Sequence, residues 1–134
     1  MKYSLSIILA LFSFTICLSA QDRFNNCSAI FVNKKLLVDD YSPTGKCVLS
    51  STATGDLTVS TATVENEKWI AGEKIAFKII IRDGATKTLW SYSDATYETV
   101  GIKEILSKCK KGDSIVISLI KDQYALPHNE ILVE

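Results

Sequence analysis

The sequence predicts a mainly β protein, a single antiparallel β-sandwich with one short helix. About seven short runs with strand character recur at spacings of roughly 8–12 residues, as in β-sandwiches. Turn residues separate these runs, and one segment alone has helical periodicity. The 134 residues contain no internal repeat and no linker that would divide them. We therefore expect one folded domain behind a short leader.

The leader is residues 1–20, which have the pattern of an export signal. Lys2 gives a positive start, an apolar run follows, and Ser19 and Ala20 precede the expected cleavage point. A signal peptidase cleaves this pattern, and the run is shorter than the roughly 20 apolar residues that span a bilayer. An uncleaved anchor is the alternative. We expect residues 21–134 to form the mature domain, exported to the periplasm or the cell exterior without membrane insertion.

The mature chain is nearly neutral. The leader holds one of the 15 basic residues and none of the 15 acidic ones, so a net charge of −1 remains. Such a chain lacks the positive field that attracts nucleic acid or an anionic membrane surface. We expect neither as a partner.

Three strands are predicted in the first half of the domain. Residues 28–32 and 35–39 are β-prone runs around Asn33-Lys34 and indicate a hairpin. A turn with Pro43 and Gly45 follows. Residues 50–63 are rich in Ser and Thr, and a solvated low-complexity tract is the alternative there; Leu57 and Val59, followed by Ala62 and Val64, favour a half-buried strand whose apolar positions change phase.

The clearest strand is residues 74–82. Ile75, Phe77, Ile79 and Ile81 alternate with polar residues, and Ile80 alone breaks the pattern. Asp83-Gly84 follows directly, before a second run over residues 86–92. An Asp-Gly step between two such runs favours a hairpin.

The helix is predicted at residues 101–111. Ile102, Ile105, Leu106 and Cys109 follow helical spacing and should pack on the sheet, while Lys103, Glu104, Lys108 and Lys110 should face water. Gly112 should end this helix in a left-handed conformation. Residues 115–120 are apolar on both faces, which predicts a central strand. After Leu126-Pro127, residues 131–133 form a last strand.

Three cysteines follow the leader. Cys109 falls on the apolar stripe of the helix, where a free thiol packs as a small hydrophobe. Cys27 and Cys47 flank the first hairpin, and export would allow a disulfide between them. No C-x-x-C pair occurs, and His128 is the single histidine. We therefore expect no metal site and no cofactor.

No set of catalytic residues stands out. A hydrolase would need His128 within reach of a nucleophile and an acid. His128 lies beside Pro127 in a turn, which is typical of an exposed loop histidine. We expect no enzyme.

Four aromatic residues are candidates for a binding platform. Trp69, Trp90, Tyr92 and Tyr124 lie in the C-terminal half, and such rings can stack on sugars or on a partner protein. The position of Trp90 within a strand favours core packing instead, and the same holds for Tyr92.

The C-terminal half also resembles a known domain. The runs KIAFKI (74–79), ILSKCKKGDSI (105–115) and LPHNEI (126–131) are similar in order to the C-terminal domain of the gliding-motility protein M family. That family is a periplasmic component of type IX secretion in Bacteroidetes. The resemblance implies an immunoglobulin-like sandwich that contributes protein contacts and no catalytic residues. Family members carry a membrane helix and tandem domains, so this chain would be a stand-alone relative.

These observations predict a non-enzymatic, exported protein-interaction module of the bacterial envelope, with an envelope or periplasmic protein as its partner. It would be related to gliding-motility and type IX secretion components. The alternative function is a small carbohydrate-binding module that uses the exposed aromatic rings.

Overall fold

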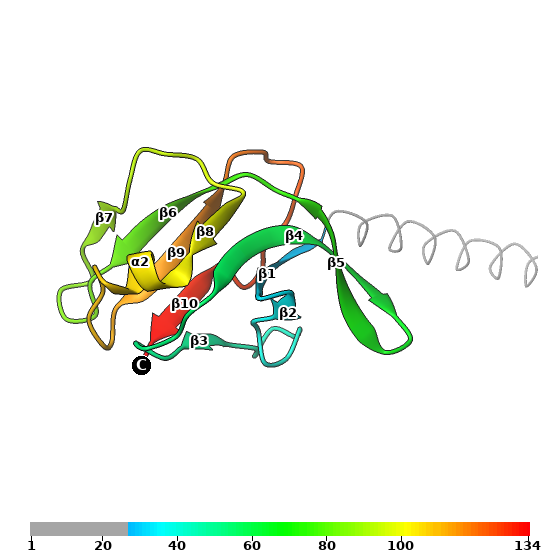
Figure 1. Ribbon diagram of the computed structural model, residues 1–134, viewed down its shortest axis with the longest axis horizontal. Coiled ribbons are helices and arrows are strands. Elements are labelled where there is room, and N and C mark those ends of the chain that lie inside the picture. Colours follow the sequence, from blue (N-terminus) through cyan, green and yellow to red (C-terminus); the bar gives the residue numbers. More distant parts are fainter. Residues whose placement is uncertain (1–26) are drawn as a thin grey trace, which may run out of the picture.

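Two β-sheets face each other across one apolar core in the computed structural model (Figure 1). The structure describes residues 27–134, so the predicted export signal lies outside the described residues. The predicted fold class is confirmed: the described chain is mainly β, its strands form two sheets, and it contains one short helix.

The first sheet has the strand order β2-β1-β4-β5, with β8 also paired to β4. All of its pairs are antiparallel. Its strands are β1 (Ser28–Val32), β2 (Lys35–Leu36), β4 (Asp56–Glu65), β5 (Lys68–Lys74) and β8 (Thr99–Gly101).

The second sheet has the order β3-β10-β9-β6-β7. Its strands are β3 (Cys47–Leu49), β10 (Glu130–Val133), β9 (Ser114–Leu119), β6 (Phe77–Arg82) and β7 (Leu89–Ser91). β3 and β10 pair in parallel, so the sandwich is not wholly antiparallel as predicted. The reason is that β3 and the C-terminal strand come from opposite ends of the domain, and no hairpin constrains their direction.

The core contains the inward residues of both sheets. Ile75, Phe77, Ile79 and Ile81 are at most 3% exposed, as their alternation predicted. Leu57 and Val59 face them from the first sheet and are fully buried. Burial of these side chains supplies the main free energy that holds the sheets together.

The phase change in β4 has a physical cause. Leu57 and Val59 enter the main core, whereas Ala62 belongs to a second, smaller cluster with Ala29 and Phe31. This cluster lies on the outer side of the first sheet. The apolar positions therefore change parity where β4 leaves one core and contributes to the other.

Beyond that point β4 and β5 form a hairpin that projects from the sandwich (Figure 1). Its turn residues Asn66 and Glu67 both have positive φ, as do Asn33 and Lys34 in the predicted β1–β2 hairpin. A β-bulge near Gly72 shifts the β4–β5 register, and the Thr61 hydroxyl accepts the Glu73 N–H there. A Cβ on Gly72 would lie 2.3 Å from that hydroxyl oxygen, which explains the glycine.

The β6–β7 hairpin is confirmed, with a longer loop than a two-residue Asp-Gly turn. Arg82 pairs with Leu89, and Lys87, not Gly84, takes the positive φ. The Asp83 carboxylate accepts the N–H groups of Ala85 and Thr86 at 2.9 Å. These hydrogen bonds lower the pKa of Asp83.

The helix α2 (Ile102–Leu106) is shorter than predicted. Its apolar residues Ile102, Ile105 and Leu106 are buried in the main core as expected, and Lys103 and Glu104 are exposed. After Leu106 the backbone hydrogen bonds span three residues instead of four: the Lys108 N–H donates to the Ile105 carbonyl, and the Cys109 N–H donates to the Leu106 carbonyl. Gly112 has the predicted positive φ of 96°, but it lies in the turn before β9 and does not end the helix.

β9 is central in its sheet, as predicted, but the expectation that both of its faces are buried is wrong. Ile115 and Ile117 are at most 1% exposed. On the opposite face Val116 is half-buried and Ser118 is exposed. The reason is that no third layer of the described chain covers the outer face of this sheet.

Asp113 joins the β6–β7 loop to the turn before β9. Its buried carboxylate accepts the N–H of Gly84 and the N–H of Lys110, each at 2.9 Å. We expect Asp113→Ala to lower the free energy of unfolding by about 1–3 kcal/mol, because two backbone N–H groups lose their acceptor. Urea denaturation beside Asp94→Ala, an exposed control, measures the difference. Equal small effects would contradict this role.

Candidate binding face

The outer face of the second sheet carries the most exposed apolar side chains of the sandwich body. The inward residues of β6 and β9 fix which side chains point outward, because neighbours in a strand alternate. Cross-strand register then places the outward residues of five strands side by side. We call this surface the β9 face; it comprises Val48, Lys78, Ile80, Arg82, Leu89, Val116, Glu130 and Leu132.

Three apolar side chains on this face are more than a third exposed. The exposed fractions are 54% for Leu89, 39% for Leu132 and 37% for Val48. Arg82 and Ser114 separate Leu89 from Leu132 in the register, and Ile80 and Val116 are half-buried in the adjacent row of the same face. Single exposed apolar residues are ordinary, but a contiguous apolar area with a polar rim is typical of an interaction surface.

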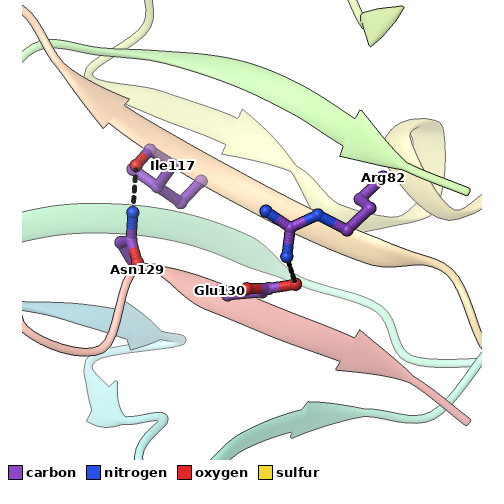
Figure 2. Close-up of polar contacts among 4 residues, drawn as sticks. All are labelled: Arg82, Ile117, Asn129 and Glu130. Atoms are coloured by element: carbon purple, nitrogen blue, oxygen red, sulfur yellow. Dashed lines mark hydrogen bonds and ion pairs between the residues drawn. The ribbon is translucent and has the colours of Figure 1, made fainter. Parts of the chain in front are cut away.

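An ion pair crosses the middle of the face. The Arg82 guanidinium reaches over β9 to the Glu130 carboxylate on β10 (Figure 2). Their side chains are 35% and 40% exposed, so the pair contributes little to stability. It places a positive and a negative group among the apolar side chains of the face. Next to it, the Asn129 side chain donates to the Ile117 carbonyl.

A groove of about 770 Å³ continues the face at the β3 edge. Val48, Glu130 and Leu132 line both the groove and the face. The opposite wall comes from the segments around Pro43 and Pro127. The groove therefore extends the β9 face to the edge of the sheet, between two turns that contain proline.

His128 joins the two turns that wall this groove. Its Nε2 lies 2.7 Å from the Ser42 carbonyl, which can only accept, so Nε2 carries the proton. The imidazole also packs edge-on against the Tyr41 ring, with 5.2 Å between the ring centroids. Its Nδ1 is buried without a hydrogen-bond partner. This histidine therefore fastens the Tyr41–Gly45 turn to the turn before β10.

Within residues 27–134, the His128 ring makes no hydrogen bond to a nucleophile or an acid, as a hydrolase would need. The ring contacts a backbone carbonyl, and Cys47 Sγ lies 3.8 Å from the backbone oxygen of His128, not from its ring. Burial, with a smaller contribution from Asp39, raises the pKa of Cys47 to about 11. The thiol is protonated at neutral pH and is a poor nucleophile.

The predicted bridge between Cys27 and Cys47 is not formed, and the three described cysteines are free thiols. Cys27 lies beside the Tyr41 hydroxyl and contributes to raising the pKa of that tyrosine to about 12, mainly an effect of burial. Cys109 is half-buried rather than buried. Burial and Asp113 raise the pKa of Cys109 to about 11.

The four predicted aromatic candidates lie in separate places. Trp69 is half-buried on β5 and stacks on Tyr41 at 4.5 Å between ring centroids. Trp90 stands on β7 in the other sheet and is 38% exposed. The expectation that Trp90 packs in the core is wrong, because β7 is an edge strand.

The two tyrosine candidates pack against the core without meeting the tryptophans. Tyr92 is half-buried 6.4 Å from Tyr97, and the Lys108 ammonium lies 5.0 Å above its ring. Tyr124 is half-buried against the main core. The structure therefore does not gather the predicted aromatic residues into one platform.

The residues of the β9 face were not singled out from the sequence. Ile80 carried the available indication: it is the apolar residue that breaks the alternation of its strand. An apolar side chain at an outward position must be covered by another layer or remain exposed. Here no layer of the described chain covers it.

Two further observations concern the described chain. Among residues 27–134, no three His, Cys, Asp or Glu side chains gather as metal ligands would. The short helix in this range falls far below the length needed to cross a bilayer.

Compared with known proteins, the chain matches no family, no curated protein and no solved structure.

Proposed function

We propose that this chain is an exported, non-enzymatic interaction module whose protein partner binds the β9 face. The observation that carries the proposal is the set of exposed apolar side chains on this face, Leu132 and Val48 next to each other and Leu89 at the β7 edge, with the Arg82–Glu130 ion pair among them. A partner would gain free energy by covering the apolar groups. The ion pair would orient it, since charged groups at interfaces contribute mainly specificity.

The groove at the β3 edge supports a partner with an extended segment. β3 is an edge strand of its sheet, and the groove runs beside it under the Tyr41–Gly45 turn. Lys46 and Lys78 flank the apolar area, and neither forms an ion pair within residues 27–134. An apolar segment with acidic neighbours therefore fits this surface best.

The sequence supports the cellular setting of this proposal. The leader pattern in residues 1–20 favours export, and the resemblance of residues 74–131 favours a stand-alone relative of the gliding-motility protein M domain. That resemblance extends from β6 through α2 and β9 to the start of β10. The partner would then be an envelope or periplasmic protein.

The test compares three matched variants. Leu132→Glu puts a carboxylate on β10 and Leu89→Glu puts one on the edge strand β7 of the β9 face, and Val64→Glu puts one on the projecting hairpin. Val64 is 56% exposed and lies on β4, in the other sheet. The exported proteins, each immobilised, are incubated with an envelope extract of the source cell, and retained proteins are compared.

We expect a protein retained by the wild type and by Val64→Glu that both β9-face variants lose. A buried unpaired carboxylate should weaken binding by at least about tenfold, because its desolvation costs more than 1.4 kcal/mol. Unchanged urea midpoints would show that all variants are folded. Retention of the same proteins by all four chains would refute binding through this face.

The alternative, a carbohydrate-binding module with several rings on one face, has less support. Trp69 and Trp90 lie on different sheets, and neither is close to Tyr92 or Tyr124 in a stacked pair. Of the four candidate rings, that of Trp69 lines a groove that also contains hydroxyl and charged side chains.

A further inference from the structure

The outer side of the first sheet contains a second groove, on a different sheet from the β9 face. Its volume is about 760 Å³, within the range of roughly 300–1,000 Å³ that is usual for small-ligand sites. Trp69 lines it from the hairpin, and Thr58, Ser60 and Thr99 line it from β4 and β8. We call it the Trp69 groove.

The bend and bulge of the sheet shape this groove. Ser60 pairs with Lys74, and Ala62 pairs with Ala71, so β5 has one extra residue between them. The bulge increases the local twist of the two strands. As a result the projecting hairpin carries Trp69 to one end of the groove.

Trp69 is held in place by a second ring. Its centroid is 4.5 Å from that of Tyr41, with 33° between the ring planes. The Tyr41 hydroxyl in turn donates to the Ser28 carbonyl at 2.9 Å. Because Tyr41 is anchored to β1 in this way, the indole is fixed in orientation while part of it remains open to the groove.

Two ammonium groups border the groove without carboxylate partners. Lys34 and Lys74 line it, and the ion pair of the described residues is elsewhere, between Arg82 and Glu130. Lys74 Nζ donates to the Thr99 hydroxyl at 3.3 Å. The Asp56 carboxylate also lines the groove, so its charged residues sum to a modest positive charge.

We infer that the Trp69 groove binds an oligosaccharide that carries carboxylates. The indole offers a flat apolar surface with a polar edge, which suits the face of a sugar ring. The hydroxyls of Thr58 and Thr99 exchange hydrogen bonds with sugar hydroxyls, and Asp56 accepts from them. Lys74 donates a charge-assisted hydrogen bond to a uronate carboxylate. This site is independent of the β9 face.

The chain contains two tryptophans, Trp69 and Trp90, so replacing Trp90 isolates the fluorescence of Trp69. Trp90→Phe leaves Trp69 as the single fluorophore. The protein is titrated with oligogalacturonate, oligomeric alginate and oligomeric hyaluronan, and with maltotetraose as the neutral control. We expect a saturable change in Trp69 fluorescence with at least one acidic sugar at millimolar concentration or below, and none with maltotetraose.

Two variants test the contacts. Lys74→Gln should weaken binding of that sugar about tenfold, the loss of one charge-assisted hydrogen bond. Trp69→Ala should abolish it, measured by calorimetry. Lys74 is exposed, so its substitution leaves the fold intact even if Trp69→Ala is destabilised. No saturable binding of any acidic sugar, equal binding of maltotetraose, or unchanged affinity of Lys74→Gln would each overturn the inference.

Discussion

Phe31→Ala should lower the free energy of unfolding by about 3–5 kcal/mol, the usual effect of truncating a fully buried phenylalanine. Phe31 is 0% exposed although it points away from the main core. It is covered by Leu36, Tyr41 and Trp69. The substitution would leave a cavity beneath the Tyr41–Trp69 stack, so this segment should detach before the sandwich unfolds.

Val64→Ala is the matched control for Phe31. Val64 lies on β4 beyond the same small cluster and is 56% exposed, so its truncation should cost less than about 0.5 kcal/mol. Urea denaturation followed by circular dichroism measures both variants. In a Trp90→Phe background, the emission of Trp69 reports the local change. A small effect of Phe31→Ala, equal to that of Val64→Ala, would mean that the Tyr41 segment does not cover Phe31.

Strands with regular alternation could be predicted from the sequence. β6 follows from Phe77, Ile79 and Ile81, because one buried face imposes a period of two. β9 was predicted from apolar residues on both parities, and β10 from the short apolar run after the break at Leu126-Pro127. The predicted β1–β2 hairpin is present because Asn33 tolerates positive φ, as its turn requires.

The strands that escaped prediction lack such a period. β3 is three residues long and pairs in parallel with the end of the chain, a long-range contact with no local indication. β5 is mostly polar and exposed. Its pairing depends on the Asn66-Glu67 turn, whose sequence is not the usual Asn-Gly. Short edge strands of this kind are formed by the partner strand more than by their own residues.

The β9 face was not predicted, because the rule that places apolar strand residues in the core was applied to its residues as well. Val116 was interpreted as a residue of a strand buried on both faces, because apolar residues on both parities are typical of a covered sheet, and Ile80 was interpreted only as a break in the alternation of its strand. The sandwich has only two layers in the described chain, so one of those faces is open. For Trp90 the prediction failed in the opposite direction, because it was expected in the core and is exposed. Trp90 lies on an edge strand, and the local sequence does not show which strands are at an edge.

The last prediction concerns α2, which lies in one of the segments that connect the two sheets. α2 lies between β8 of the first sheet and β9 of the second, and Leu106 is 7% exposed within the main core. Leu106→Ala should lower the free energy of unfolding by about 2–5 kcal/mol, as deletion of a buried leucine side chain does. Urea denaturation midpoints, with an unchanged slope, measure this loss.

Glu104→Ala isolates burial from helix propensity, because Glu104 is in the same short helix and is exposed. Alanine is the best helix former, so both substitutions leave the helix itself equally favoured. Glu104→Ala should therefore change stability by less than about 0.5 kcal/mol. If both variants had equally small effects, α2 would not be part of the core, and its apolar side would itself become a candidate surface for the partner.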